Sequence, residues 1–212
     1  MRLISRMFIA CIDIGKPGAN LGWAAVDGDV SSDGTNLDVC VEAVATALQR
    51  GPASLGFESP LFLPVRDDPL TLNKARQGES GKGLLSRPFS APAGSTVAVL
   101  GLLIATYVLK RLRKLCPEAV ATMDWRNPPT GAGSLLIWEA FITGQAKTHD
   151  TRHVEDAQLA IQGYQERMAN PAEAVSSVHE PSCLNLVGAA LLRTGWTTDV
   201  AVLADQCLVV RV

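Results

Sequence analysis

The sequence lacks the excess of positive charge that is typical of proteins binding nucleic acid mainly through its phosphates. It contains 19 lysine and arginine residues and 21 acidic residues, for a formal net charge of -2. Proteins with such a positive excess gain much of their affinity for nucleic acid by neutralising its phosphate charge. Any contact with nucleic acid must therefore depend on a local patch of basic residues.

Paired cysteines, long apolar segments and internal repeats are also missing. The five cysteines are widely spaced and form no C-x-x-C pair, which predicts reduced, mostly buried thiols in a cytoplasmic protein. The longest apolar run, 97–109, is shorter than the roughly 20 residues that span a bilayer. It predicts a buried helix, and no membrane contact is expected. The basic start of the chain has no small-residue cleavage site and predicts no signal peptide.

The composition is that of a folded globular protein. The chain has 212 residues, of which 47% are hydrophobic, enough to bury a sizeable core. We expect a single α/β domain over residues 1–212, because apolar runs typical of strands alternate with segments of helical periodicity.

The first part of the chain predicts strand, hairpin, helix and strand in that order. The continuous apolar run 7–12 ends at Asp13, and a second run, 21–26, follows a turn. Residues 38–50 have apolar side chains at helical spacing and stop at Gly-Pro. The short strand 54–57 is followed by Glu58, and the order of the elements places this strand beside the first one.

The remainder predicts a long insertion and several further elements. Residues 60–95 show no convincing periodicity, so we expect an insertion loop there, which in a compact domain is usually functional. The later elements are expected as a helix over 96–116, a strand over 134–138 with Glu139 at its end, a helix capped by Asp150 or Thr151 and closed after Met168, a helix over 181–194 and a hairpin over 200–212.

Carboxylates follow the strands that we expect to be neighbours. Asp13 and Glu58 end two such strands, and Asp156, three residues after His153, lies on a late helix that can pack across the same sheet end. Sites in open sheets form outside the carboxyl ends of strands. Clustered carboxylates repel one another unless a cation lies between them, and Mg²⁺ and Mn²⁺ prefer oxygen ligands. The pattern therefore predicts a site for Mg²⁺ or Mn²⁺ at Asp13, Glu58 and Asp156.

These motifs resemble the RNase H-like superfamily. The resemblance is carried by Ile12-Asp13-Ile14-Gly15, Gly22-Trp23-Ala24, Glu58-Ser59-Pro60, Trp138-Glu139 and the segment from His153 to Ala157, and it is closest to a family of uncharacterised, predicted RNase H-like nucleases. It implies an RNase H-like mixed sheet flanked by helices. The chain departs from that family in carrying Glu58 where aspartate is common.

The resemblance also implies roles for individual residues. Asp13 would bridge metal ions, Glu58 and Asp156 would hold them, and Glu139 or His153 would lie beside the site. Two such ions activate a water and stabilise the leaving oxygen of a phosphodiester. The implied activity is that of a metal-dependent nuclease with nucleic acid as its partner. Basic side chains near these motifs are candidates for contacts with substrate phosphates, with ordinary solvated loop charges as the alternative: Lys16, Arg76, Lys82 and Arg87.

Two other functions stay open at this point. The same fold could serve as a non-catalytic binding or scaffold domain, which the mild negative charge favours. Asp-Ile-Gly also opens actin-like and sugar-kinase ATPases, but these need a duplicated domain and a second phosphate loop. A chain of 212 residues without a repeat leaves little room for them.

Overall fold

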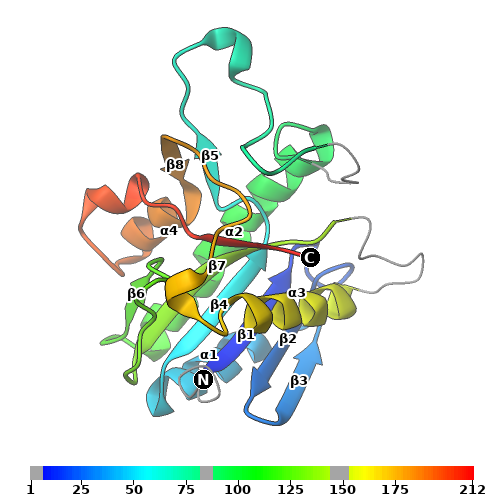
Figure 1. Cartoon of the computed structure of the whole chain (residues 1–212). Coiled ribbons are helices and arrows are strands. Elements are labelled where there is room, and N and C mark those ends of the chain that lie inside the picture. The colour runs from blue at the N-terminus through cyan, green and yellow to red at the C-terminus, as the bar shows by residue number, and fades with distance from the viewer. Residues whose placement is uncertain (1–6, 82–87, 144–152) are drawn as a thin grey trace.

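The computed structural model describes residues 7–81, 88–143 and 153–212. Its centre is a mixed seven-stranded sheet with the order β3-β2-β1-β4-β7-β6, in which β9 also pairs with β7. Helices flank both faces of this sheet (Figure 1). The expected α/β class, with a mixed sheet between helices, is confirmed. The strands of this sheet are β1 (Phe8–Asp13), β2 (Gly22–Asp27), β3 (Val30–Gly34), β4 (Ala53–Glu58), β6 (Val120–Thr122), β7 (Ser134–Phe141) and β9 (Leu208–Arg211).

Strands β1, β2 and β4 and the first helix form as the sequence predicts, and the structure adds β3, which the sequence interpretation did not include. Strands β1, β2 and β3 make an antiparallel meander, and β4 returns parallel to β1. Helix α1 (Leu37–Arg50) connects β3 to β4. The Asn36 side chain caps this helix by accepting a hydrogen bond from the backbone N–H of Asp38, which satisfies a donor that the first helical turn leaves unbonded. The strand ending at Glu58 therefore lies beside the strand ending at Asp13.

Two cores, one on each face of the sheet, hold the layers together. Helices α1, α2 (Pro92–Leu115) and α4 (Leu186–Thr194) cover one face, and α3 (His153–Arg167) covers the other. Adjacent residues of a strand point to opposite faces. Accordingly, Ile12 and Phe57 belong to the core under α1 and α2, whereas Cys11 packs toward α3.

Helix α2 is long and apolar enough to cross a membrane by length and composition alone. In the fold, its residues Ile104, Val108 and Leu109 are buried against the sheet, as in the core helix of a globular domain. The helix begins at Pro92, four residues before the predicted start at Thr96. Proline is well suited to the first turn of a helix because the N–H that it lacks would have no helical partner there.

The described part of the segment 60–95 contains regular elements that the predicted insertion loop did not include. It contains strand β5 (Phe62–Pro64), a short 3-10 helix (Pro69–Thr71) and the first turn of α2. Strand β5 pairs with β8 (Cys183–Asn185) in a separate two-stranded sheet. Because the partner of β5 lies more than a hundred residues further along the chain, no local pattern indicated this strand.

Two expectations for the end of the chain are wrong. The helix predicted over 181–194 begins only at Leu186, after β8, and Asn185 caps it. The hairpin predicted over 200–212 is a 3-10 helix (Val200–Leu203) followed by β9, which pairs parallel to β7. The Asp199 side chain accepts a hydrogen bond from the backbone N–H of Ala201, which favours the turn over an extended strand. The proposed caps Asp150 and Thr151 lie outside the described residues.

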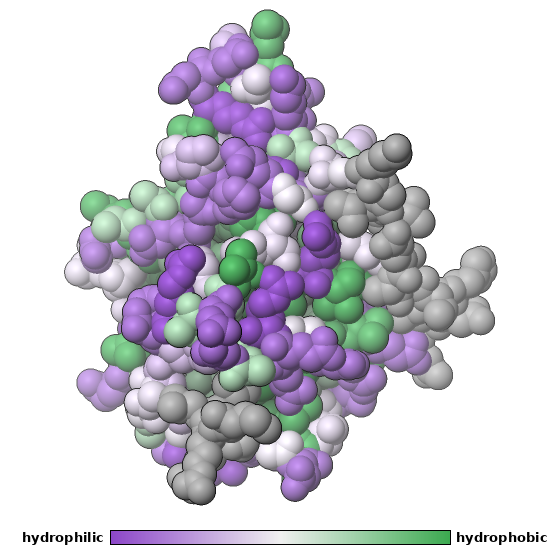
Figure 2. All heavy atoms as spheres, viewed as in Figure 1, coloured by the Kyte–Doolittle hydropathy of each residue, from purple (hydrophilic) through white to green (hydrophobic). Residues whose placement is uncertain are grey.

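The face that carries α3 is mainly polar. Apolar residues are scattered among hydrophilic ones over the described part of this face (Figure 2). Isolated apolar residues of this kind are ordinary on protein surfaces.

Candidate metal centre

The paired ends of β1 and β4 bring two carboxylates to the same face of the sheet. Asp13 and Glu58 are register partners on these parallel strands. The residues before them, Ile12 and Phe57, point into the core under α1 and α2. Since side chains alternate along a strand, Asp13 and Glu58 both point toward α3. The sequence predicted this neighbourhood from the order of the elements.

Gly22 allows α3 to begin directly above Asp13. Gly22 is the register partner of Asp13 on β2. A Cβ atom at this position would lie 2.5 Å from the backbone of both His153 and Val154. Real Cβ atoms do not approach backbone so closely, so any other residue would push the first turn of α3 away. The Gly-Trp motif thus has a packing role that spacing alone did not reveal.

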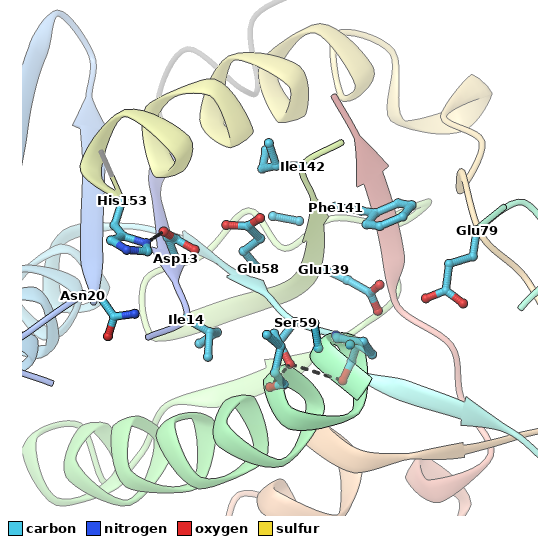
Figure 3. Close-up of a pocket in the computed structure, with 15 residues that line it drawn as sticks. Asp13, Ile14, Asn20, Glu58, Ser59, Glu79, Glu139, Phe141, Ile142 and His153 are labelled. Atoms are coloured by element: carbon cyan, nitrogen blue, oxygen red, sulfur yellow. Dashed lines mark hydrogen bonds and ion pairs between the residues drawn. The ribbon is translucent and has the colours of Figure 1, made fainter. Parts of the chain in front are cut away.

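Asp13, His153 and Asp156 converge at this point. One carboxylate oxygen of each aspartate and one ring nitrogen of His153 lie within 4.8 Å of one another. Asp13 and Asp156 are buried, and His153 Nδ1 is hydrogen-bonded to Asp13 Oδ2. Figure 3 shows His153 directed at Asp13 from the start of α3. Two carboxylates and an imidazole in this arrangement are chemically suited to hold a divalent cation.

Glu58 lies beside this cluster and lines the same cavity. The cavity has a volume of about 380 Å³ and is open to solvent, and its wall contains Asp13, Glu58 and His153 together with apolar side chains such as Ile14, Val97 and Ile142. Glu58 is not one of the three residues whose ligand atoms all lie within 4.8 Å of one another. The structure therefore joins Asp13 and Asp156 directly and places Glu58 next to them.

Glu139 does not join the cluster, because it points to the opposite face of the sheet. Strand β7 continues to Phe141, so Glu139 lies inside the strand and not at its end. Its register partner on β4 is Phe57, whose side chain is in the core under α1 and α2. Glu139 therefore shares the face of Phe57, away from Glu58. The resemblance implied that Glu139 or His153 lies beside the site: His153 belongs to the cluster, whereas Glu139 lies outside it and lines the same cavity.

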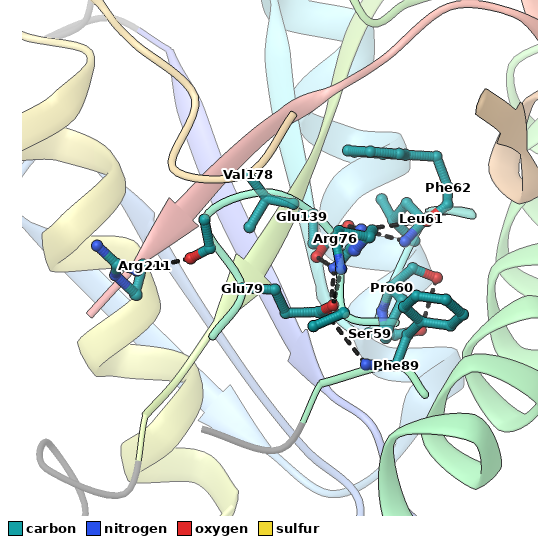
Figure 4. Close-up of polar contacts among 12 residues, drawn as sticks. Ser59, Pro60, Leu61, Phe62, Arg76, Glu79, Phe89, Glu139, Val178 and Arg211 are labelled. Carbon is teal, nitrogen blue, oxygen red and sulfur yellow. Dashed lines mark hydrogen bonds and ion pairs between the residues drawn. The ribbon is translucent and has the colours of Figure 1, made fainter. Parts of the chain in front are cut away.

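On that face Glu139 forms a buried ion pair with Arg76 (Figure 4). Arg76 Nη2 lies 2.6 Å from Glu139 Oε1, and Nη1 lies 2.9 Å from Oε2. Glu139 also accepts a hydrogen bond from the backbone N–H of Leu61 at 2.8 Å. Burial raises the pKa of Glu139, and the charge of Arg76 opposes this rise in part. The pair fixes the chain just after β4, which carries Glu58.

Arg76 was predicted to contact substrate, but the structure assigns it to this network. Its side chain is 0% exposed. Besides Glu139, it donates to Glu79 at 3.1 Å and to the carbonyl of Phe62 at 3.1 Å. Burial on its own would lower the pKa of Arg76, but Glu139 and Glu79 raise it above the usual value. A guanidinium enclosed in this way has a structural role and does not reach a phosphate.

The other predicted substrate contacts have different outcomes. Lys16 is exposed in the loop between β1 and β2, where its backbone N–H bonds to the side chain of Asn20, a residue of the cavity wall. Lys82 and Arg87 lie outside the described residues. The sequence interpretation missed Asn20 and Glu79. Glu79 lies three residues after Arg76, a spacing that suits an ion pair, but nothing local indicated that the pair would be buried.

Comparisons with known proteins add no relative to this picture. No protein-family model matches the chain, and no curated protein and no solved structure is significantly similar to it. The function is therefore inferred from the geometry of the site and from general chemistry.

Proposed function

We propose that this protein is a divalent-metal-dependent phosphodiesterase, namely a nuclease, with an RNase H-like fold. The observation that supports the proposal best is the convergence of Asp13, His153 and Asp156, which come from positions 140 residues apart in the chain, at the carboxyl end of a central strand. The antiparallel β3-β2-β1 meander followed by parallel β4 and β7 suits the RNase H-like resemblance of the motifs.

The donor set determines which residues would hold the ion. Asp13, Asp156 and His153 supply two oxygens and one nitrogen, and the two carboxylates match the charge of a divalent cation. Such an ion supplies Lewis acidity and a water of lowered pKa for attack on a phosphodiester. Glu58, the register partner of Asp13, would serve as a general base or as a further oxygen ligand.

The cavity and its surroundings favour a substrate that presents a single accessible phosphodiester. Among the described residues that line the cavity, His153 is the only basic one, so the bound ion would be the main partner of the scissile phosphate. Lys16, at the loop beside the cavity, supplies a nearby positive charge. A single strand or a branched end fits such a site better than a regular duplex held along a basic groove.

The five cysteines suit a cytoplasmic location for this enzyme. All five are free and buried. Burial raises the pKa of Cys40 to about 12, which keeps this thiol protonated at neutral pH. Free thiols in such numbers are typical of proteins from reducing compartments. The proposed setting is therefore the cytoplasm.

The proposal is tested with purified protein and Mn²⁺ or Mg²⁺ on single-stranded, branched and RNA–DNA hybrid substrates. We expect cleavage of at least one substrate, abolished by EDTA and reduced by at least about a hundredfold in the Asp13→Asn variant. Glu166→Gln is the matched control, because it removes one carboxylate from the exposed side of the same helix that carries Asp156. Equal rates in the Asp13→Asn variant and the unaltered protein would exclude the proposed site.

A further inference from the structure

The ligand set of the candidate metal centre mixes oxygen and nitrogen. Asp13 and Asp156 each offer a carboxylate oxygen, and His153 offers a ring nitrogen at the same point. Carboxylates bind Mg²⁺ and Mn²⁺ alike, whereas imidazole is a good ligand for first-row transition ions. Mg²⁺ gives up its waters reluctantly and favours oxygen donors. The nitrogen is therefore the donor that distinguishes between these ions.

The position of His153 is determined by the fold and not by a flexible side chain alone. His153 is the first residue of α3, and its backbone rests against β2 where Gly22 leaves room. Nδ1 of its ring is hydrogen-bonded to Asp13 Oδ2, as Figure 3 shows, and an ion bound at this point would take the place of the proton between the two atoms. A ligand whose backbone and ring are both held loses little entropy when it binds an ion. The nitrogen is thus a built-in part of the centre.

We infer that this centre selects Mn²⁺ over Mg²⁺ and that His153 sets the selectivity. The inference rests on the proposed function, because it identifies the ion of the proposed site. Mn²⁺ accepts two carboxylates and an imidazole together, while Mg²⁺ must exchange a water for a nitrogen that it binds poorly. Replacing His153 by an oxygen donor would remove this difference.

The affinities of the protein for the two ions test the inference. The protein is titrated with Mn²⁺, the free ion is followed by its electron paramagnetic resonance signal, and Mg²⁺ is added as competitor. We expect the ratio of the Mg²⁺ Kd to the Mn²⁺ Kd to fall by about tenfold or more in the His153→Asp variant, since even indirect partners of a metal site change affinity by that factor. His179→Asp is the control, because His179 is exposed and lines a different cavity.

A spectroscopic measurement on bound Mn²⁺ does not depend on how well the His153→Asp variant folds. Pulsed electron paramagnetic resonance detects the coupling of Mn²⁺ to a ligating nitrogen. We expect this coupling in the unaltered protein and in His179→Gln, and its loss in His153→Gln. Absence of nitrogen coupling in the unaltered protein, or equal affinity for both ions, would overturn the inference and leave the proposed phosphodiesterase standing. Failure of the unaltered protein to bind Mn²⁺ or Mg²⁺ would remove both.

Discussion

Two buried acidic clusters lie on opposite faces of the sheet, near the carboxyl ends of its central strands. They differ in what balances their charge. On the α2 face, Glu139 and Glu79 surround the guanidinium of Arg76, so the chain supplies its own cation. On the α3 face, Asp13 and Asp156 gather around His153, and Asp13 and His153 line a cavity. The first arrangement stabilises the structure, and the second is suited to accept a cation from solvent. The identity of the residues alone does not separate the two roles.

The largest expected effect on the free energy of unfolding comes from removing the guanidinium of Arg76. Arg76→Met leaves Glu139 and Glu79 buried without their guanidinium, and breaking one side of a buried pair costs about 3–5 kcal/mol. The free energy of unfolding, measured by urea titration, should fall by that amount. Adding Glu139→Gln should restore part of the loss, because one of the two buried charges is then removed. A loss below about 1 kcal/mol in the single variant would show that the network is not the anchor described above.

Only the cluster of Asp13, His153 and Asp156 should bind an added ion, so the stability gained from Mn²⁺ should depend on this cluster and not on Glu139. At a Mn²⁺ concentration of about 100 times its Kd, a site present only in the folded state adds about 2.7 kcal/mol of stability. We expect this gain in the unaltered protein and in Glu139→Gln, and its loss in Asp156→Asn. Thermal unfolding with and without Mn²⁺ measures it. If Glu139→Gln loses the gain while Asp156→Asn keeps it, the assignment of the two faces is reversed.

Replacing Gly22, which lies beneath the first turn of α3, should have a smaller effect on stability. This effect should be specific to the face of the sheet that carries Asp13, His153 and Asp156. In Gly22→Ala, the new methyl group would lie 2.5 Å from the backbone of His153, and relieving such a contact costs about 1–3 kcal/mol. The shifted helix should also weaken Mn²⁺ binding. Gly131→Ala is the control, since a Cβ there meets nothing within 4 Å. Unchanged Mn²⁺ affinity in Gly22→Ala would mean that α3 does not need this close approach.

The sequence predicted the parts of the site that depend on local signals and element order. The capped helix 37–50 and the parallel pairing that brings Glu58 to Asp13 followed from periodicity and connectivity. The placement of His153 and Asp156 on one side of a helix followed from their spacing. All of these features are set within a short stretch of chain or by the order of neighbouring elements.

Glu139 shows why the rest could not be predicted. Its face depends on the register of β7 against β4, and a shift of one residue would have turned it toward Asp13. The length of β7 depends in turn on β9, which pairs along Trp138 to Phe141 from the far end of the chain. The burial of Arg76, which was predicted to contact substrate or to be a solvated loop charge, could not be predicted for the same reason, because its partners are brought to it by long-range pairing. Register and burial are properties of the whole fold.

The smallest expected effect concerns the pH dependence of stability on the α2 face. Burial raises the pKa of Glu139 above its usual value of 4.5. Between that value and the raised pKa, the folded state holds more protons than the unfolded state, so the contribution of Glu139 to stability falls as the pH rises through this window. The difference in unfolding free energy between the unaltered protein and Glu139→Gln should therefore change with pH, by about 1.4 kcal/mol for each unit of the rise. The test uses only the change of this difference with pH. The part of the difference that does not vary with pH includes the loss of the ion pair with Arg76 in Glu139→Gln. A difference that increases in favour of the unaltered protein as the pH rises toward 4.5, and then stays constant above it, would show that Arg76 outweighs burial and lowers the pKa of Glu139.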